Sequence, residues 1–306
     1  MGSKETPLKV VFPHINSVCI NTTKDCLDKW QELTTDPVIL EYVSGCKIDF
    51  ESFPIQDSLP HIIKMNSEEN SALRSLIESF LREGVIRKTF RENGDYINNV
   101  FLREKRVSDQ SEIKYRMILN VKSLNKHVKY QHFKMSSLET CLNLLSPNCF
   151  MGSLDLKNAY HSVPMDETFR KYFKFEIDGQ FYEFCTLPQG FSSSPRIFTK
   201  IMKPVLSHLH NKGILICVYI DDYFVVGISY EECAKSIKYT FKLLKALGFR
   251  ISEKSSLIPS QVICHLGFVI DSCLMTVSIS ADKRESIVHL LKSFLREPFV
   301  SVRHLS

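Results

Sequence analysis

Two adjacent aspartates interrupt an otherwise apolar stretch, GILICVYIDDYFVVGIS, at residues 213–229. Each apolar run is typical of a buried β-strand, and so short a polar break between the runs predicts a hairpin. Adjacent carboxylates at a rigid turn repel each other unless a cation neutralises them. Their oxygen atoms favour a hard metal such as Mg2+, with Mn2+ as the alternative ion. An ordinary Asx turn would need no metal, so the hairpin alone leaves both interpretations open.

A third carboxylate, Asp155, ends the apolar stretch CFMGSLDL earlier in the chain. If this stretch pairs with the hairpin in one sheet, Asp155 lies beside Asp221 and Asp222. Three carboxylates on neighbouring strand ends can hold two Mg2+ ions ~4 Å apart, which is the arrangement used for nucleotidyl transfer. The third carboxylate therefore favours the metal interpretation over the Asx turn.

The composition indicates a globular protein without a membrane segment. The chain has 306 residues, 44% of them hydrophobic, which is enough for the cores of about two domains or subdomains. No apolar run approaches the ~18 residues of a membrane span, and the polar N-terminal stretch MGSKETPLKVVF lacks a signal-peptide core. The 10 cysteines include no C-x-x-C pair and no zinc-like Cys/His cluster. We therefore expect reduced thiols in an intracellular protein of the cytoplasm or nucleus that is not secreted.

Positive charge is concentrated in one segment. The whole chain carries a net charge of +5. Between Arg103 and Lys129, eight Lys and Arg residues are opposed by three acidic residues, so this segment alone equals the net charge of the chain. Such a run is either a solvated face or a phosphate-binding surface, and the charge count alone does not decide between them.

The pattern of apolar residues predicts a mixture of helices and antiparallel hairpins, an α+β fold. Capping boxes are predicted at Asn66 with Glu69 and at Ser229 with Glu232. Pro204 should kink or split its helix, and the apolar stretch from Pro37 to Pro54 should be extended. The predicted helices span 66–84, 136–145, 194–210, 229–248 and 281–295; the predicted hairpins span 96–125 and 176–184; single strands are predicted at 149–156 and 262–270.

Six stretches resemble the ordered motifs of reverse transcriptases. LDLKNAYHSVP, LPQGFSSSPRIF and YIDD resemble the three central palm motifs. KYRMILNVKSLNK resembles the preceding fingers motif, while LGFRISEKS and HLGFVID resemble the two motifs that follow. The resemblance runs from about Glu68 to Ser280. The similarity is greatest to the enzymes of DIRS-type retrotransposons, which encode a tyrosine recombinase and are related to the Ty3/gypsy group. It is carried by the stretches NCFMGSLDLKNAYHSVP, PRIFTKIMKPV and HLGFVIDSCLMTV.

The resemblance implies a right-hand polymerase fold with fingers, palm and the start of a thumb. Its expected divisions are an N-terminal extension at 1–60, fingers at 61–134, palm at 135–162, a second part of the fingers at 163–193, palm at 194–277, and a truncated start of the thumb at 278–306.

The resemblance also implies roles for residues around the carboxylates. Asp155, Asp221 and Asp222 match the metal-binding triad of the family. Tyr160 matches the aromatic gate that leaves no room for a 2′-hydroxyl and so selects dNTPs; the alternative is a core tyrosine. Gln189 matches the segment that packs over the nucleotide, together with the adjacent Gly190.

Further matches concern phosphates and primer. Arg116 matches the arginine that binds the triphosphate, which a guanidinium can do through two hydrogen bonds. Lys105 matches a second phosphate-binding lysine, and Lys254 matches a proton donor to pyrophosphate, although it is equally an ordinary surface lysine. The run His265–Leu266–Gly267 matches the primer grip.

The sequence therefore predicts an RNA-directed DNA polymerase that uses dNTPs and an RNA or DNA template with a primer, without a membrane partner. The alternative is an inactive or domesticated nucleic-acid-binding remnant. An RNA-directed RNA polymerase is disfavoured by Tyr160. We expect the ribonuclease H and tyrosine recombinase domains of such an element to lie outside this chain, which stops at VRHLS, where relatives continue.

Overall fold

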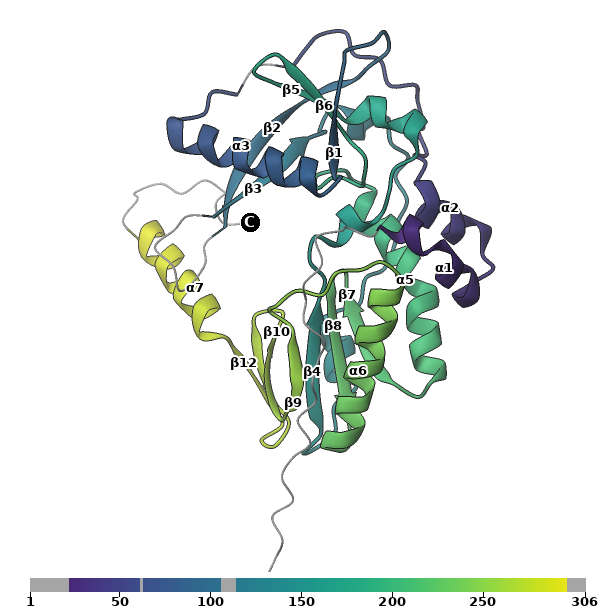
Figure 1. Cartoon of the computed structure of the whole chain (residues 1–306). Helices are drawn as coiled ribbons and strands as arrows, with labels where there is room; N and C mark the ends of the chain where they lie inside the picture. Colours follow the sequence, from purple (N-terminus) through teal and green to yellow (C-terminus); the bar gives the residue numbers. More distant parts are fainter. Residues whose placement is uncertain (1–21, 61–62, 106–113, 296–306) are drawn as a thin grey trace, which may run out of the picture.

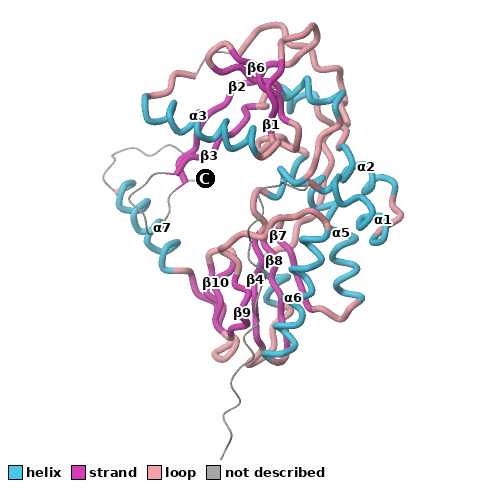
Figure 2. The backbone as a smooth tube through the Cα atoms, in the orientation of Figure 1, coloured by secondary structure: helices cyan, strands magenta, loops and turns pink. Residues whose placement is uncertain are grey.

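The computed structural model describes residues 22–60, 63–105 and 114–295. The described strands form three sheets (Figure 1). Figure 2 shows a five-stranded sheet in the upper half and a four-stranded sheet in the lower half, joined by loops at one side. The tip of the predicted hairpin at 96–125 lies partly outside the described residues, as does part of the basic segment.

The five-stranded sheet draws its strands from two separate stretches of the chain. Its order is β1-β6-β5-β2-β3, with β2 and β3 forming the predicted antiparallel hairpin. Helix α3 (Ser67–Arg82) packs on this sheet and begins with the predicted reciprocal capping box between Asn66 and Glu69. The strands are β1 (Ile86–Thr89), β2 (Ile97–Lys105), β3 (Lys114–Asn120), β5 (Lys174–Ile177) and β6 (Gln180–Phe184).

The four-stranded sheet has the order β7-β8-β4-β9 and packs against two long helices (Figure 1). The helices are α5 (Ser194–Asn211) and α6 (Tyr230–Ala246). The apolar faces of these helices pack on the sheet and form the core with it. Side chains on these faces, such as Ile201 and Phe241, are almost completely buried. The strands are β4 (Phe150–Asp155), β7 (Leu215–Tyr219), β8 (Asp222–Gly227) and β9 (Ser256–Ser260).

The structure revises two predictions about these helices. Of the two outcomes predicted for Pro204, a split is wrong, because α5 continues through it while Met202 and Val205 on either side are buried in the core. At the start of α6, the Glu232 backbone N–H donates to Ser229 Oγ at 3.2 Å, as predicted. The Glu232 carboxylate, however, accepts from the backbone N–H of Ile228 at 3.2 Å. The predicted reciprocal box is therefore only half formed.

The predicted extended segment at 37–54 is wrong over its first half, which is helical. A short 3-10 helix, η1 (Thr23–Cys26), leads into α1 (Leu27–Leu33) and α2 (Pro37–Gly45). Asp36 caps α2 by accepting from the Val38 backbone N–H at 2.9 Å. Trp30 is fully buried, and its Nε1 donates to the Leu247 carbonyl at 3.1 Å, which ties α1 to the end of α6.

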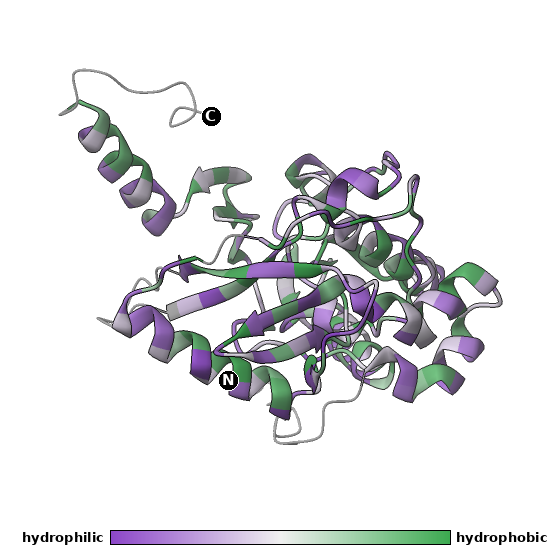
Figure 3. Cartoon of the chain, turned by 90° about the horizontal axis from the view of Figure 1, so that it is seen from above, coloured by the Kyte–Doolittle hydropathy of each residue, from purple (hydrophilic) through white to green (hydrophobic). Residues whose placement is uncertain are grey.

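The stretch predicted as one strand at 262–270 is instead a hairpin. Leu266 and Gly267 have positive φ values of 50° and 77°, which reverse the chain between β10 (Val262–His265) and β11 (Phe268–Asp271). A third strand, β12 (Thr276–Ile279), completes the three-stranded sheet and leads into α7 (Ala281–Phe294). Figures 1 and 3 show α7 standing clear of both large sheets. None of its residues is buried.

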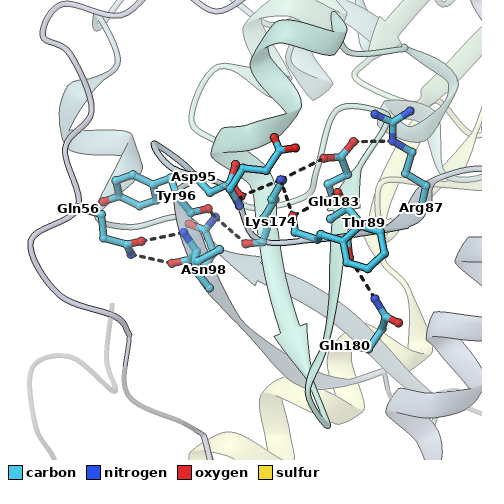
Figure 4. A network of polar contacts seen from close by, with 12 residues as sticks. Gln56, Arg87, Thr89, Asp95, Tyr96, Asn98, Lys174, Gln180 and Glu183 are labelled. Carbon is cyan, nitrogen blue, oxygen red and sulfur yellow. Dashed lines mark hydrogen bonds and ion pairs between the residues drawn. The ribbon is translucent and has the colours of Figure 1, made fainter.

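A buried polar network holds the β1–β2 connection to the five-stranded sheet (Figure 4). Lys174 is 2% exposed, and its Nζ lies 2.7 Å from an Asp95 carboxylate oxygen and 2.9 Å from the Phe90 carbonyl oxygen. Its second carboxylate neighbour, Glu183, is also paired with Arg87. A buried ammonium is tolerated only with such partners. No local pattern in the sequence predicted this network.

The cysteine prediction also needs correction. Cys141 and Cys217 form a disulfide with a Cα–Cα distance of 5.7 Å, so this pair is not reduced in the structure. Cys141 lies on α4 (Leu138–Leu142), which packs against β7. The two residues are 76 positions apart, and only the tertiary fold brings them together.

Three further 3-10 helices connect these elements: η2 (Leu124–His127), η3 (Ala159–Ser162) and η4 (Glu167–Phe173). Within the described ranges, no helix is both long enough and apolar enough to cross a membrane.

Candidate active site

The first feature of the site is the pairing of the two carboxylate-bearing strand ends. β4 runs antiparallel to β8, and Asp155 is the register partner of Asp222. The predicted pairing of these stretches in one sheet is therefore confirmed. Asp221 lies in the turn between β7 and β8, next to Ile220, whose φ is +56°. The Leu156 backbone N–H donates to the Asp221 carbonyl at 3.0 Å, which fixes the turn against the end of β4.

A cleft of about 420 Å³ opens beside this turn and collects predicted site residues from distant parts of the chain. Asp155 and Asp221 lie in its wall. β3, η3 and the loops before α5 and β9 supply the others, so the cleft exists only when both large sheets are in place. Its predicted site residues are Arg116, Asp155, Tyr160, Gln189, Asp221 and Lys254.

The electrostatics of the carboxylates favour a cation. Burial, followed by the negative charges of Asp221 and Asp155, raises the pKa of Asp222 to about 6. Half-buried carboxylates that repel one another present the all-oxygen donors that Mg2+ prefers. Across the described ranges, no three His, Cys, Asp or Glu side chains are already arranged around a common point. The fit to Mg2+ therefore rests on the chemistry of the donors, because Asp155, Asp221 and Asp222 offer only carboxylate oxygens.

Tyr160 combines both of its predicted environments. It lines the cleft, and its ring also meets the ring of Phe198 edge to face at 5.7 Å between centroids. Burial, followed by the charges of Asp221 and Tyr219, raises the pKa of Tyr160 to about 12. The hydroxyl therefore stays protonated at neutral pH, and a neutral aromatic ring forms this part of the wall.

Gly190 is held very close to β3. Its φ is +102°, and a Cβ at this position would lie 2.7 Å from the Leu119 carbonyl oxygen. Asn125 fixes the same loop, because its amide donates to the Gly190 carbonyl and accepts from the Ser192 backbone N–H, both at 3.0 Å. This contact positions the adjacent Gln189 at the cleft. Asn125 was not predicted as a site residue, although it lies within the fingers-like motif KYRMILNVKSLNK.

Two cations of the predicted set line the cleft. Arg116 on β3 and Lys254 before β9 both line it. Lys105 is the last residue of β2 and the register partner of Lys114 in the β2–β3 ladder. Lys157 was not predicted but lines the cleft two positions after Asp155. That proximity in the sequence was the available signal.

The three residues of the predicted primer grip lie in two different environments. His265 is 3% exposed and packs on the Phe224 ring with 4.9 Å between centroids. Burial lowers the pKa of His265 to about 4, so the ring is a neutral core side chain. The His265 side chain therefore faces the core and is not presented to a primer. Only the backbone turn at Leu266 and Gly267 is left for that predicted role.

Comparison with known proteins identifies relatives of the chain. The family model described as reverse transcriptase (RNA-dependent DNA polymerase) matches residues 105–270. The chain is 29% identical over 196 residues to a putative enzymatic polyprotein of Cassava vein mosaic virus, covering 64% of this chain and 29% of that protein. It is 26% identical over 196 residues to the retrovirus-related Pol polyprotein from transposon gypsy of Drosophila melanogaster, covering 63% and 18%.

A third relative is the Gag-Pol polyprotein of Walleye dermal sarcoma virus, 28% identical over 214 residues, covering 69% of this chain and 12% of that protein. The chain thus spans less than a third of the length of each of these three relatives.

Solved structures show the same fold. The foamy viral protease-reverse transcriptase dRH in complex with double-stranded DNA has a TM-score of 0.67 at 20% identity, covering 92% of this chain and 46% of that chain. The foamy viral protease-reverse transcriptase in complex with an RNA/DNA hybrid has a TM-score of 0.64 at 20% identity, covering 81% and 33%. At this identity the likeness concerns the fold alone, and it confirms the predicted α+β polymerase fold.

Proposed function

The chain belongs to the reverse transcriptase family, as a domain of the kind found in retroelement Pol and Gag-Pol polyproteins, and on that premise we propose that it is an RNA-directed DNA polymerase. One observation carries the proposal. A single cleft brings together two carboxylates, an arginine, two lysines and a half-buried tyrosine from separate elements. These are the groups needed to join a dNTP to the 3′-hydroxyl of a primer.

The carboxylates are the proposed metal ligands. Asp155 and Asp221 would hold two Mg2+ ions, or Mn2+ in their place, and Asp222 would support them. When bound, these ions lower the pKa of the attacking 3′-hydroxyl and neutralise the departing pyrophosphate. The like charges that raise the pKa of Asp222 are the reason why the site favours a cation.

The basic residues of the cleft would bind and orient the triphosphate. The Arg116 guanidinium can form two parallel hydrogen bonds to phosphate oxygens. Lys254 lines the same cleft, where its ammonium could donate a proton to the pyrophosphate as the bond to the α-phosphate breaks. Lys105, at the end of β2, is proposed as a second phosphate ligand. Lys157 adds a further cation to the wall.

The Tyr160 ring would set the choice of sugar. It forms a neutral, bulky part of the cleft wall beside Asp221 and is supported by Phe198. A ring under the sugar leaves no space for a 2′-hydroxyl, so we propose selection of dNTPs over NTPs. Gln189, held by the Gly190 loop, would pack over the incoming nucleotide.

The proposed partners are an RNA or DNA template with its primer. The backbone turn at Leu266 and Gly267 is the proposed primer contact. We further propose an origin in a DIRS-type retrotransposon, an intracellular site of action, and ribonuclease H and tyrosine recombinase domains outside this chain. The proposed divisions into fingers, palm and thumb keep the boundaries given above.

Primer extension tests the proposed function. The purified chain is given a DNA primer annealed to an RNA template, dNTPs and Mg2+, and parallel reactions contain EDTA, Mn2+ or NTPs. We expect extension with dNTPs that depends on the divalent ion and is much weaker with NTPs. Binding of the primer–template without extension in either metal would contradict the proposal and favour the nucleic-acid-binding remnant.

A further inference from the structure

A short turn lies against the end of β4, just before β9 begins. The ladder between β4 and β9 includes a register pair at Ser153, two positions before the end of β4. Residues 252–255 then form a turn, which is closed by a 3.2 Å hydrogen bond from the Ser255 backbone N–H to the Ser252 carbonyl. We call residues 252–255 the serine turn. Asp155, the last residue of β4, is its neighbour across the sheet.

Both ends of the serine turn are hydrogen-bonded to the backbone of Asp155. The Ser252 backbone N–H donates to the Asp155 carbonyl at 2.7 Å. The Asp155 backbone N–H donates to Ser255 Oγ at 3.0 Å. In a regular antiparallel ladder, a carbonyl of the neighbouring strand accepts from such an N–H, whereas here a side chain takes its place. Ser255 is therefore the residue whose side chain fixes the backbone at a candidate catalytic carboxylate.

The serine turn also carries a cation of the cleft. Lys254 belongs to the turn, and both Lys254 and Ser252 line the cleft together with Asp155. The Lys254 backbone N–H donates to Ser252 Oγ at 3.3 Å, which fixes the backbone of the lysine within the turn. The hydrogen bonds of the two serines, Ser252 and Ser255, thus join Asp155 and Lys254 into one unit.

Arg250 anchors the chain on the other side of the serine turn. Its carbonyl accepts from the Lys157 backbone N–H at 2.8 Å. Its guanidinium lies 3.0 Å from the carboxylate of Glu83, at the end of helix α3, which packs on the five-stranded sheet. The Arg250 and Glu83 side chains are 28% and 19% exposed, so the pair is screened less than one at the surface. The serine turn is therefore held between Arg250 and the start of β9.

We propose that Ser255 is a positioning residue for nucleotide addition. Its hydroxyl fixes the end of β4, so that the Asp155 carboxylate and the Lys254 ammonium keep their relative positions in the cleft. The inference rests on the proposed function, because it takes Asp155 and Lys254 as groups that act on the dNTP. A displacement of ~1 Å at a reacting group can reduce a rate by about a hundredfold. Loss of the Ser255 hydroxyl should therefore slow the chemical step more than it weakens substrate binding.

Hydrogen exchange tests the contact itself, without metal or substrate. Mass spectrometry of short overlapping peptides from β4 would follow the Asp155 amide in EDTA. Ser255→Ala removes the acceptor of this amide and should speed its exchange, whereas Ser255→Thr keeps a hydroxyl and should keep the exchange slow. Ser256→Ala is the matched control, because Ser256 is the next residue and pairs with Ser153 in the ladder. The control should exchange like the wild type at Asp155.

Primer extension kinetics test the role in the reaction. On an RNA template with Mg2+, Ser255→Ala should lower kcat by roughly tenfold to a hundredfold and leave the KM for dNTP close to the wild-type value. Ser255→Thr should restore most of kcat, and Ser256→Ala should match the wild type. A serine with a merely structural role would lower the melting temperature without separating kcat from KM in this way.

The outcomes separate this inference from the proposed function. A wild-type kcat in Ser255→Ala would overturn the positioning role and leave the polymerase function standing. Unchanged exchange at Asp155 in that variant would also overturn it, because the hydroxyl would then not hold this amide. A loss of kcat that Ser255→Thr does not restore would have the same meaning. If the wild type extends no primer, the proposed function fails, and the inference fails with it whatever the exchange result.

Discussion

Asp155 and Asp222 face each other across the antiparallel ladder between β4 and β8, and both are half-buried. Asp221, the third carboxylate, lies in the turn that directly precedes β8. The backbone therefore holds it close to Asp222. Burial and like charge raise the pKa of Asp222 to about 6, so the cluster destabilises the metal-free fold at neutral pH. The sheet tolerates this cost where a cation can offset it.

Asp221→Asn and Asp155→Asn should each reduce dNTP incorporation by about a thousandfold, because each removes a metal ligand worth ~4 kcal/mol in the transition state. Without metal, the same variants should be more stable than the wild type by about 1 kcal/mol, since one repulsive charge is gone and solvent screens part of the effect. Primer extension and thermal melting in EDTA measure the two effects. A wild-type rate of extension by Asp221→Asn would remove it from the catalytic site.

Tyr160→Ala should admit ribonucleotides. Removal of the ring opens space for one hydroxyl group, and the ratio of rNTP to dNTP incorporation should rise roughly tenfold to a hundredfold. The variant also loses the contact with Phe198, so stability should fall by about 3 kcal/mol. Tyr160→Phe is the control, because it keeps the ring and should keep the wild-type ratio. An unchanged ratio in Tyr160→Ala would mean that the ring does not contact the sugar.

The carboxylate pairing was predictable because its signals are local. Apolar runs that end in Asp155 and flank Asp221 determine both the strands and the side on which the carboxylates emerge. The family-like motifs around Tyr160 and Gln189 place those residues in the same way, and the cleft contains both. Here the hydrophobic pattern, the turn and the chemistry all indicate the same arrangement.

Features that depend on distant partners were not predictable. α1 and α2 are short, and α1 is held by Trp30 against the end of α6, far along the chain. From the sequence, Lys174 would be taken for an exposed lysine. Only the folded chain brings Asp95 and Glu183 next to its ammonium group. His265 matched a motif, but its ring is buried against Phe224, which the motif does not reveal. In each case tertiary packing overrides the local pattern.

Gly190→Ala should raise the KM for dNTP. The new Cβ would meet the Leu119 carbonyl at 2.7 Å in a left-handed conformation, so the loop carrying Gln189 must move away from β3. Gly179→Ala is the matched control, because Gly179 also has positive φ but a Cβ added there would meet no atom within 4 Å. Both variants should lose about 1–2 kcal/mol of stability from backbone strain, and only Gly190→Ala should change KM. Equal KM values in the two variants would contradict the proposed role of this loop.

Acid should destabilise the fold through His161. This side chain is buried between the rings of Phe80 and Phe184, and burial lowers its pKa to about 4, with Glu83 opposing and Arg250 adding to the shift. The unfolded chain binds a proton near pH 6.5, so the stability contributed by the neutral ring is complete above that pH. It is lost as the pH falls from about 6.5 to about 4, by about 3 kcal/mol in total.

Denaturant unfolding at several pH values measures this effect. His161→Phe removes the titrating group and should lose less stability between pH 7 and pH 4 than the wild type. His289→Gln is the control, because His289 is exposed on α7 and should leave the pH dependence unchanged. If His161→Phe and the wild type show the same pH dependence, His161 is not the buried neutral group described above.

The leucines of α7 should contribute little to stability. Leu290 and Leu291 are 48% and 55% exposed, and no residue of this helix is buried. Leu290→Ala combined with Leu291→Ala should therefore change the free energy of unfolding by less than ~0.5 kcal/mol. Leu244→Ala, at a fully buried position of α6, should cost ~2–5 kcal/mol in the same denaturant experiment. A loss of similar size in the α7 variant would show that another surface covers this helix in solution, since an exposed leucine has no packing to lose.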